Sequence, residues 1–465
     1  MTRSHRFADP VLERYARLAE DLGAEMRTAT PASTGIGAPG NGPGTASPAD
    51  LGRSPMAQPA NASANAVPFV RASTLAAMQD KTLNNMTAGQ AVTVQLQTNA
   101  FLAFVVLDVN IVAVNVTTAV KWQADGPFNI FGASGIALSD PANQAIITPI
   151  SGFKLAQLNK YLTDTGCNFD ASRDPGFFMV PTAANNATGS TAANAGSASF
   201  RLVLPLELRR RDAFGAVTNS AANQAMNLTL TPAASFGGGA DTENNVYQAA
   251  AAPATSVTLN VSIWQVYWTA PPASIQSGGA SAATQRTPAG LGTLSFVRSE
   301  RHNENSGGGS APIQLTSVGD VITNIVWTLR TSSNNARDAY TAGTTINGQY
   351  ANWPNVFNFA VNDFTTLALG QAYWVREMAR FYGLWNGVSA QAGNPGYLDA
   401  AVFTFGPWFS GIMDESVNFL GASQYLATTA QTKLQVRGST FGSSTGNLEV
   451  DVRIVRPNTG PALYS

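Results

Sequence analysis

Hydrophobic and polar residues alternate most regularly in two long runs, one in the middle of the chain and one near its end. The hydrophobic positions are Val257, Leu259, Val261 and Ile263 in the first run and Leu448, Val450, Val452 and Ile454 in the second. A period of two predicts half-buried β-strands. Proline lacks the N–H that a β-ladder needs, and it follows both runs, at 271–272 and at 457. Each half of the chain therefore ends on a long strand, and we interpret the halves as two copies of one β-fold.

Shorter runs of the same kind predict further strands in both halves. They cover 92–96, 101–107, 109–116, 200–208, 226–231 and 256–268 in the first half, and 293–297, 313–316, 321–330, 401–405, 416–420, 432–438 and 447–455 in the second. Many short strands separated by turns rich in glycine and proline favour a β-sandwich or a jelly roll.

One helix interrupts the strand pattern in each half. The segment 151–165 begins with a potential cap at Ser151 and has a leucine stripe at Leu155, Leu158 and Leu162. The segment 364–382 follows a potential cap at Asn362 or Asp363. Its apolar stripe consists of Leu367, Trp374, Met378 and Phe381. We therefore predict a short helix within each β-unit.

A third helix is predicted at 9–27, where an apolar stripe faces charged residues. The residues that define the stripe and its charged flank are Val11, Arg14, Tyr15, Arg17, Leu18 and Leu22. Such a helix packs on its own protein or forms an arm that contacts a neighbouring chain or a membrane surface. A segment rich in alanine, glycine and proline follows it and is predicted to be a flexible tether.

These patterns predict five consecutive parts. They are an N-terminal amphipathic arm at 1–29, a tether at 30–66, a first β-domain at 67–271, a linker at 272–290 and a second β-domain at 291–465. A chain of 465 residues is too long for one ordinary core and fits two domains of this size.

Charge and cysteine content narrow the classes of function. Charged residues make up 12% of the chain and the net charge is −1, so the surface must be covered by neutral polar groups or by neighbouring subunits. The absence of a basic surplus argues against a nucleic-acid-binding protein. One cysteine, Cys167, excludes an intrachain disulfide framework. The polar N-terminus predicts no secretory signal, and no run is apolar enough for a membrane span.

No set of residues matches a known catalytic or metal-binding pattern. The two histidines are His5 and His302, and we interpret His302 as a solvated residue of a polar turn at 299–304. The segment 241–245 offers oxygen ligands for calcium but lacks the spacing of a known loop. Two acidic pairs, Asp414 with Glu415 and Glu449 with Asp451, are weak candidates for a glycosidase. We therefore predict no catalytic, cofactor or metal site and no enzymatic activity.

Three consecutive arginines, Arg209, Arg210 and Arg211, end a predicted strand and enter a turn. Two interpretations remain open. The arginines are charged residues that flank a loop, or they form salt bridges to another subunit.

Several segments, taken in their order along the chain, resemble the double jelly-roll major capsid proteins of the PRD1–adenovirus lineage. The resemblance is greatest to those of tectivirus-like phages that contain a membrane. The segments are 128–162 (strand, Asp-Pro-Ala-Asn turn, strand, then Ser-Gly into a helix), 203–217 (VLPLELRRRDAFGAV), the passage 261–298, the amphipathic N-terminal helix and the strand series 416–455. The long tether at 30–66 departs from this pattern.

The resemblance implies an all-β fold of two consecutive eight-stranded jelly rolls, each with a short helix insertion. It implies a major capsid protein whose homotrimers, with three times two rolls, have a near-hexagonal outline and tile an icosahedral virion of a bacteriophage. It also implies minor capsid or vertex proteins and an internal lipid membrane as partners, no sequence-specific contact with nucleic acid, and assembly in the host cytoplasm.

Two other classes of protein remain possible from the residues alone. A secreted carbohydrate-binding or carbohydrate-cleaving β-sandwich would use aromatic residues such as Trp353 and Trp408, but it would need a signal peptide. A phage tail-fibre or spike subunit would show long repetitive β-stretches, which are missing.

Overall fold

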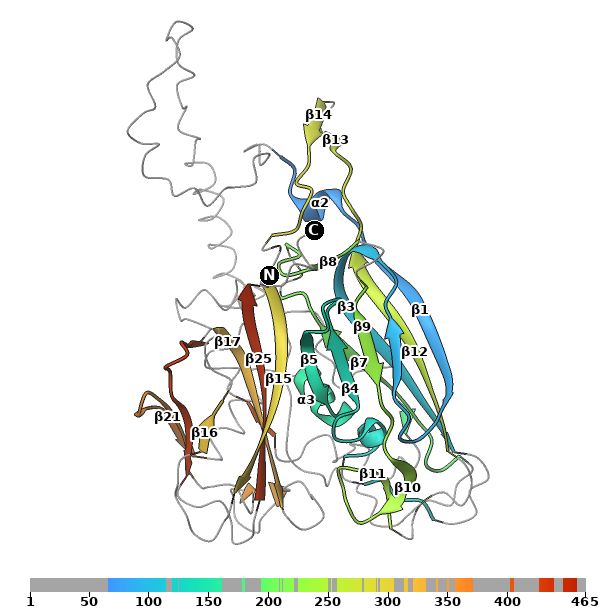
Figure 1. The fold of residues 1–465 in the computed structure, drawn as a ribbon, viewed down its shortest axis with the longest axis vertical. Coiled ribbons are helices and arrows are strands. Elements are labelled where there is room, and N and C mark those ends of the chain that lie inside the picture. The colour runs from blue at the N-terminus through green and yellow to red at the C-terminus, as the bar shows by residue number, and fades with distance from the viewer. Residues whose placement is uncertain are drawn as a thin grey trace, which may run out of the picture. The chain divides into compact units, whose positions relative to one another are not determined.

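A computed structural model of the protein places the predicted strands that it describes in two jelly rolls (Figure 1), and the strand predicted at 416–420 lies outside the described residues. The residues it describes are 66–113, 119–123, 125–160, 178–179, 194–208, 210, 212–220, 225–249, 252, 257–277, 280–289, 291, 293–304, 313–316, 321–331, 340–341, 349–350, 356–370, 402–404, 426–438 and 446–457. The predicted arm at 1–29 and the tether at 30–65 lie outside these ranges.

The first roll, Leu75–Trp268, contains eight principal strands. They are β1 (Leu75–Met86), β2 (Val92–Gln95), β3 (Asn99–Ala113), β4 (Ile136–Ser139), β5 (Ala145–Ile150), β7 (Ala198–Pro205), β9 (Asn227–Leu230) and β12 (Val257–Trp268). One sheet has the order β1-β12-β3-β7 and the other has the order β2-β9-β4-β5. The lesser strands are β6 (Phe178–Met179), β8 (Val217–Asn219), β10 (Ser235–Gly239) and β11 (Asn245–Gln248).

The second roll, Thr293–Pro457, repeats this arrangement. Its principal strands are β15 (Thr293–Glu304), β16 (Ile313–Leu315), β17 (Val321–Thr331), β20 (Val356–Val361), β21 (Phe364–Gly370), β22 (Val402–Thr404), β24 (Leu434–Gly438) and β25 (Gly446–Pro457). They form sheets of order β15-β25-β17-β22 and β16-β24-β20-β21. The lesser strands are β18 (Tyr340–Thr341), β19 (Gln349–Tyr350) and β23 (Leu426–Ala427).

Numbering the principal strands of each roll from one to eight gives the same two sheets in both rolls. One is a 1-8-3-6 sheet and the other is a 2-7-4-5 sheet. This order is that of an eight-stranded jelly roll built from two Greek keys. The prediction of a duplicated all-β fold is therefore confirmed by strand connectivity, which is independent of sequence similarity between the halves.

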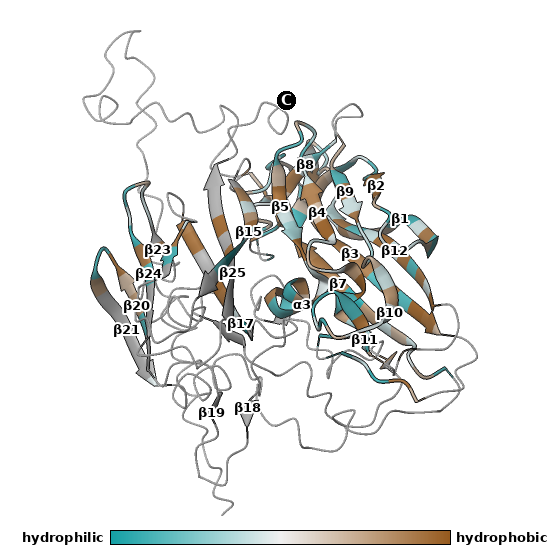
Figure 2. Cartoon of the chain, turned by 60° about the horizontal axis from the view of Figure 1, so that its bottom comes forward, coloured by the Kyte–Doolittle hydropathy of each residue, from teal (hydrophilic) through white to brown (hydrophobic). Residues whose placement is uncertain are grey.

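Alternation within the strands places one side of each sheet in the core (Figure 2). In β3 the side chains of Val105, Leu107, Val109 and Ile111 are buried, whereas Asn110 is exposed. The same alternation in β12 buries Leu259, Val261 and Ile263, as predicted. The predicted strands at 101–107 and 109–116 belong to one strand, β3, as far as Ala113, because Asp108 faces outward without interrupting the ladder; residues 114–116 lie outside the described residues.

Helix α3 (Gly152–Lys160) is the predicted helix of the first roll. The hydroxyl oxygen of Ser151 accepts a hydrogen bond from the backbone N–H of Lys154 at 3.1 Å, which is the predicted N-cap. Near the other end of α3, the buried amide of Asn159 accepts from the N–H of Val203 and donates to its carbonyl, at 2.8 and 2.7 Å. This side chain therefore pairs with the backbone of β7 beyond Ser199, where no described strand lies on that edge. The short elements α2 (Phe69–Ala72) and η2 (Phe128–Phe131) complete the described helices.

The helix predicted at 364–382 is wrong over 364–370, which form β21. Asn362 and Asp363 do not cap a helix. Both have positive φ angles, 50° and 68°, and they form the tight turn between β20 and β21. Residues of this type tolerate the left-handed region, and the twist of such a turn matches that of a hairpin. The remaining stripe residues, Trp374, Met378 and Phe381, lie outside the described residues.

The interdomain passage is more regular than its composition predicts. Its glycine- and alanine-rich segment contains a hairpin of β13 (Ser274–Ser277) and β14 (Ala280–Ala283). The N–H of Val67 donates to the carbonyl of Ala283 at 2.8 Å, so the start of the described chain is tied to this hairpin. The domain boundaries themselves stay predictions.

Candidate functional site

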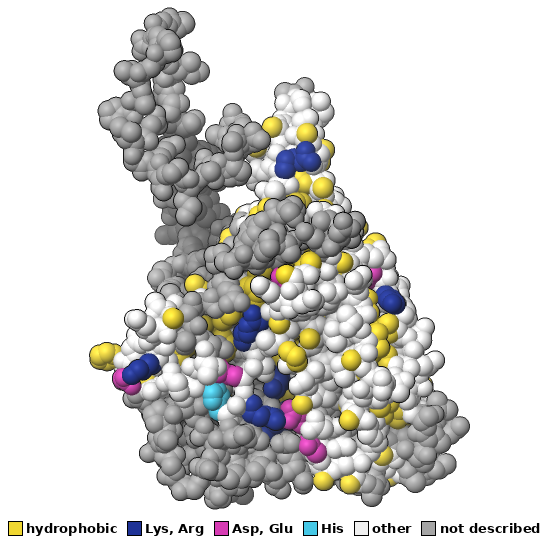
Figure 3. All heavy atoms as spheres, in the orientation of Figure 1, with side chains coloured by type: hydrophobic (Ala, Val, Ile, Leu, Met, Phe, Trp, Pro, Cys, Tyr) yellow, Lys and Arg dark blue, Asp and Glu magenta, His cyan; other side chains and the backbone are white. Residues whose placement is uncertain are grey.

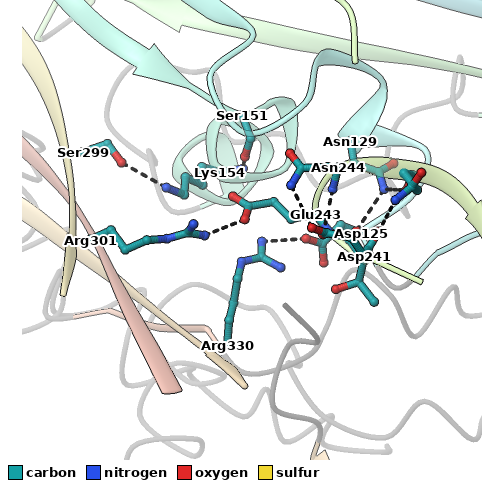
Figure 4. Close-up of polar contacts among 12 residues, drawn as sticks. Asp125, Asn129, Ser151, Lys154, Asp241, Glu243, Asn244, Ser299, Arg301 and Arg330 are labelled. Carbon is teal, nitrogen blue, oxygen red and sulfur yellow. Dashed lines mark hydrogen bonds and ion pairs between the residues drawn. The ribbon is translucent and has the colours of Figure 1, made fainter. Parts of the chain in front are cut away.

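Buried polar side chains gather at the junction between the two rolls (Figure 4). The Nη2 atom of Arg330, in the third strand of the second roll, lies 2.6 Å from the Oδ2 atom of Asp125 in the first roll. Neither side chain has any exposed surface. The guanidinium carbon also lies 5.6 Å from the centre of the Phe153 ring in α3. An ion pair in such surroundings fixes the relative position of two surfaces, because either charge alone would be costly to bury.

Strand β15 brings three further contacts to the same junction. Arg301 Nη2 lies 2.5 Å from Glu243 Oε2, and the Nζ atom of Lys154 donates to the Ser299 hydroxyl at 3.1 Å. Arg298 donates to the carbonyl of Ala145 at 2.7 Å. Arg298, Arg301 and Arg330 of the second roll therefore each meet an acceptor of the first roll.

The two rolls are also joined by backbone. Val297 in β15 and Ile147 in β5 form one parallel bridge, which joins the 2-7-4-5 sheet of the first roll to the 1-8-3-6 sheet of the second. With β23, which pairs with β17, the joined sheet has nine strands. The backbone N–H of Ser299 donates to the Thr148 hydroxyl at 3.1 Å, and this hydroxyl donates to the Val297 carbonyl at 3.3 Å. The joining of the sheets at a single residue pair keeps the rolls distinct.

The junction covers the outer face of the second roll's 1-8-3-6 sheet. Outer face here means the side of this sheet that points away from the core of its own roll. On β17 this side carries Val326, Thr328 and Arg330, all at most 1% exposed. The opposite side carries Trp327, whose ring centre lies 6.2 Å from that of Phe359 within the second roll. Both sides of β17 are therefore buried, one in its own core and one against the first roll.

The segment 241–245 presents Glu243 to this junction. The Oδ1 atom of Asp241 accepts from the backbone N–H groups of Glu243 and Asn244, at 2.9 and 3.1 Å. Asn129 Nδ2 donates to the carbonyls of Thr242, at 3.1 Å, and Asn245. These hydrogen bonds engage carboxylate and carbonyl oxygens of the segment 241–245, which were the possible ligands for calcium. No group of three His, Cys, Asp or Glu residues suited to a metal ion occurs within the described residues.

His302 lies in strand β15 and not in a polar turn, so that interpretation of 299–304 is wrong. Its Nε2 atom is 3.2 Å from Glu300 Oε2, which also accepts from the backbone N–H of Thr316 at 2.9 Å. Burial raises the pKa of Glu300, but the hydrogen bonds from His302 and Thr316 outweigh it and hold the pKa below its usual value. The histidine therefore serves to pair a carboxylate within the strand.

The arginine cluster is described in part. Arg210 is half-buried, and its guanidinium carbon lies 4.8 Å from the centre of the Phe104 ring. Arg209 and Arg211 lie outside the described residues. Nearby, Trp268 Nε1 donates to the buried Glu207 at 3.4 Å. Burial raises the pKa of Glu207 to about 7, although the charge of Arg210 and the hydrogen bond from Trp268 oppose this increase.

We expect Glu207 to make the protein less stable as the pH rises through the neutral range. Its pKa is higher in the folded chain, about 7, than the usual value of 4.5, so the folded state binds the proton more tightly. The contribution is fully present below pH 4.5 and is lost by about pH 7. It amounts to about 3 kcal/mol at most.

Glu207→Gln keeps the acceptor for Trp268 and removes the titration. Chemical denaturation from pH 4.5 to 8 should then show the variant gaining stability relative to the natural chain, whereas a pH-independent difference would contradict the assignment.

The other candidates fall outside the part of the chain that the structure describes. These are Val11, Arg14, Tyr15, Arg17, Leu18 and Leu22 of the predicted arm, together with His5, Cys167, Asp414 and Glu415. Glu449 and Asp451 lie in β25, but their side chains are not described. None of the helices in the described ranges is both long and apolar enough to span a membrane.

The sequence analysis missed Asp125 and Arg330. A signal was present in 321–330, where polar Thr328 and charged Arg330 continue the same alternate positions as Val326 in an otherwise apolar strand. A charged residue in a strand that has hydrophobic residues on both sides indicates a buried partner for that charge. Nothing in the sequence identifies that partner as Asp125, which lies about 200 residues earlier.

No family model matches this chain, and no curated protein sequence matches it. Among solved structures, the capsid of the virus PBCV-1 is 9% identical. It aligns over 82% of this chain and 93% of its own, with a TM-score of 0.51. The major capsid protein of the Sulfolobus turreted icosahedral virus is 14% identical over 83% of this chain and 97% of its own, with a TM-score of 0.49. The matched structures are double jelly-roll major capsid proteins, and the predicted double jelly-roll fold is confirmed.

Proposed function

We propose that this chain is the major capsid protein of an icosahedral virus. The observation that carries the proposal is the pair of jelly rolls with identical strand order, locked together by a buried junction, in a fold shared with the PBCV-1 capsid. An enzyme would need a reactive group, whereas the buried charges at the junction are engaged in holding two rolls together. The proposed role is structural and not enzymatic.

The composition of the surface supports assembly with copies of the same chain. Hydrophobic and uncharged polar side chains dominate the visible face over β1 and β12, and charged side chains are few (Figure 3). With 12% charged residues and a net charge of −1, the chains repel one another weakly. We propose homotrimers, in which six similar rolls give a near-hexagonal outline, and a shell built from these trimers and from minor capsid or vertex proteins.

Narrower parts of the proposal rest on the resemblance in sequence. The amphipathic arm at 1–29 would approach an internal lipid membrane, and Arg209, Arg210 and Arg211 would form salt bridges between subunits. The virus would be a bacteriophage that assembles in the host cytoplasm, without sequence-specific contact between this chain and nucleic acid.

The alternative, a secreted carbohydrate-binding or carbohydrate-cleaving β-sandwich, is not favoured by the fold comparison. Specific binding of the chain to sugars on a glycan array would support this alternative.

We expect the purified chain to form a stable trimer. Size-exclusion chromatography with light scattering should give about 146 kDa, three times the 48.6 kDa of the chain. Negative-stain electron micrographs should show particles with a hexagonal outline. A monomer at all concentrations up to the micromolar range, with no assembly into larger particles, would contradict the proposed function.

A further inference from the structure

The short helix α2 is held at one end of the first roll by a hydrophobic cluster of its own (Figure 1). Phe69 of α2 is 2% exposed, and its ring centre lies 5.2 Å from that of Phe101 and 6.2 Å from that of Trp268. This Phe69 cluster is separate from the main core, and its buried members are Phe69, Phe101, Ala103, Ala213, Ala216 and Trp268. Docking of α2 on the roll therefore depends on a small number of aromatic contacts.

Hydrogen bonds attach α2 to the interdomain passage and not to the roll. The backbone N–H of Phe69 donates to the side-chain oxygen of Gln285 at 3.3 Å, and the N–H of Val67 donates to the carbonyl of Ala283. In the part of the chain that the structure describes, the hydrogen bonds of residues 67–73 reach only this segment itself and that passage. Packing of the Phe69 ring is therefore what holds the segment against the roll.

A buried carboxyl group adjoins the Phe69 cluster. Glu207 is 2% exposed, and its backbone N–H donates to the carbonyl of Ala103 at 2.8 Å. Its Oε2 atom accepts from Nε1 of Trp268, the same tryptophan whose ring contacts Phe69. A neutral carboxyl group can be accommodated among apolar side chains, whereas a carboxylate there loses its hydration. The charge state of Glu207 is therefore coupled to the packing of this cluster.

The charged residues nearest to Glu207 come from the loop that follows β7. The charge of Arg210 lowers the pKa of Glu207 and the charge of Asp212 raises it, but burial is the largest influence. The other elements at the cluster contribute two exposed arginines, Arg71 of α2 and Arg286 of the interdomain passage. The ends of β3 and β12 that meet the cluster are uncharged. Access of water to the cluster would therefore remove the main cause that keeps this carboxyl group neutral.

We infer that protonation of Glu207 controls the docking of α2 on the first roll. A neutral carboxyl group allows the Phe69 cluster to stay packed, and an ionised one favours separation of α2 because water then hydrates the charge. The docked state binds the proton more tightly than the undocked state, so docking weakens as the pH rises. Residues 1–65 precede this segment in the chain, so the same proton regulates how the predicted arm at 1–29 is attached. This inference goes beyond the proposed function and does not depend on it.

Hydrogen exchange of backbone amides in the full chain tests the inference. Mass spectrometry should follow the segment 66–73, where four N–H groups are hydrogen-bonded, and the segment 257–263 of β12 as a reference. After correction for the intrinsic pH dependence of exchange, we expect the protection of 66–73 to fall by up to about 30-fold between pH 5.5 and 8. This factor follows from a pKa of about 7 for docked Glu207 and the usual 4.5 for the undocked state. The protection of 257–263 should not change.

Three substitutions identify the groups responsible. Glu207→Gln keeps the acceptor for Trp268 and cannot ionise, so the protection of 66–73 should stay high up to pH 8. Phe69→Ala removes the ring that docks, so this protection should be low at every pH. Asp108→Asn is the matched control, because it removes another acidic residue of the first roll, away from the Phe69 cluster. It should leave the pH dependence of the natural chain unchanged.

Two outcomes would overturn the inference. One is protection of 66–73 that is the same at pH 5.5 and pH 8, or that falls equally in Glu207→Gln. The other is an equal loss of protection in 257–263, because Glu207 would then act on the stability of the whole roll and not on the docking of α2. Neither result concerns the association of chains, so the proposed function stands or falls separately, by the light-scattering measurement.

Discussion

Arg330→Met is expected to lower the free energy of unfolding by about 3–5 kcal/mol, because it leaves Asp125 charged and buried without its partner. Desolvation of a carboxylate is costly, and both side chains of the pair are fully buried. Urea denaturation followed by tryptophan fluorescence measures the change. The two rolls of the variant should also unfold in two separate transitions instead of one, because the ion pair joins elements of both rolls.

Two variants separate the buried pair from the effect of losing an arginine. Arg201→Met removes an arginine from a pair with the same 2.6 Å separation, but its side chains are 49% and 36% exposed, so the expected loss is below about 1 kcal/mol. The double variant Asp125→Leu with Arg330→Met removes both buried charges and should recover most of the loss. Equal effects of Arg330→Met and Arg201→Met would refute the view that the junction depends on a buried ion pair.

The positions of many strands of the two rolls follow from local patterns in the sequence. Alternation in 257–263 and 448–454 identifies the last strand of each roll, and proline marks its end. The leucine stripe of α3 and the cap at Ser151 are equally local. Such signals are strong because one side of each element must face the core, whatever its partner is.

The errors arise where one local pattern fits two structures. Residues 362–370 have a helix-cap residue followed by apolar positions, yet Asn362 and Asp363 also suit the turn of a tight hairpin. Pairing of β21 with β20 decides between these possibilities, and that contact is not visible in the segment alone. The same holds for the polar residues 299–304, which continue β15 because β25 lies beside them.

The junction could not be predicted because its members come from distant parts of the chain. Asp125, Glu243 and Arg330 have no spacing that relates them, and each alone is an ordinary charged residue. Their roles emerge only when the second roll's outer face is placed against the first roll. The outer side of the first roll's 1-8-3-6 sheet shows the same limit: Trp264, Val106 and Val203 lie side by side there, although they belong to three different strands.

Gly135→Ala is expected to prevent the first roll from folding stably. A Cβ atom at this position would lie 1.5 Å from the carbonyl oxygen of Phe131 and 2.5 Å from that of Thr231. Both obstacles are backbone atoms. One belongs to η2, and the other adjoins β9, where the Thr231 N–H donates to the Gly135 carbonyl at 2.7 Å. Rotation of a side chain cannot relieve such an overlap, so we expect a loss above about 4 kcal/mol, among the largest effects of single substitutions.

Gly237→Ala is the matched control for this substitution. The nearest atom to a Cβ there is the hydroxyl oxygen of Ser235 at 3.1 Å, which can move away. Its effect should stay within about 1 kcal/mol by the same denaturation measurement. If Gly135→Ala retained the stability of the natural chain, this result would contradict the position of the turn before β4 between the backbones of Phe131 and Thr231.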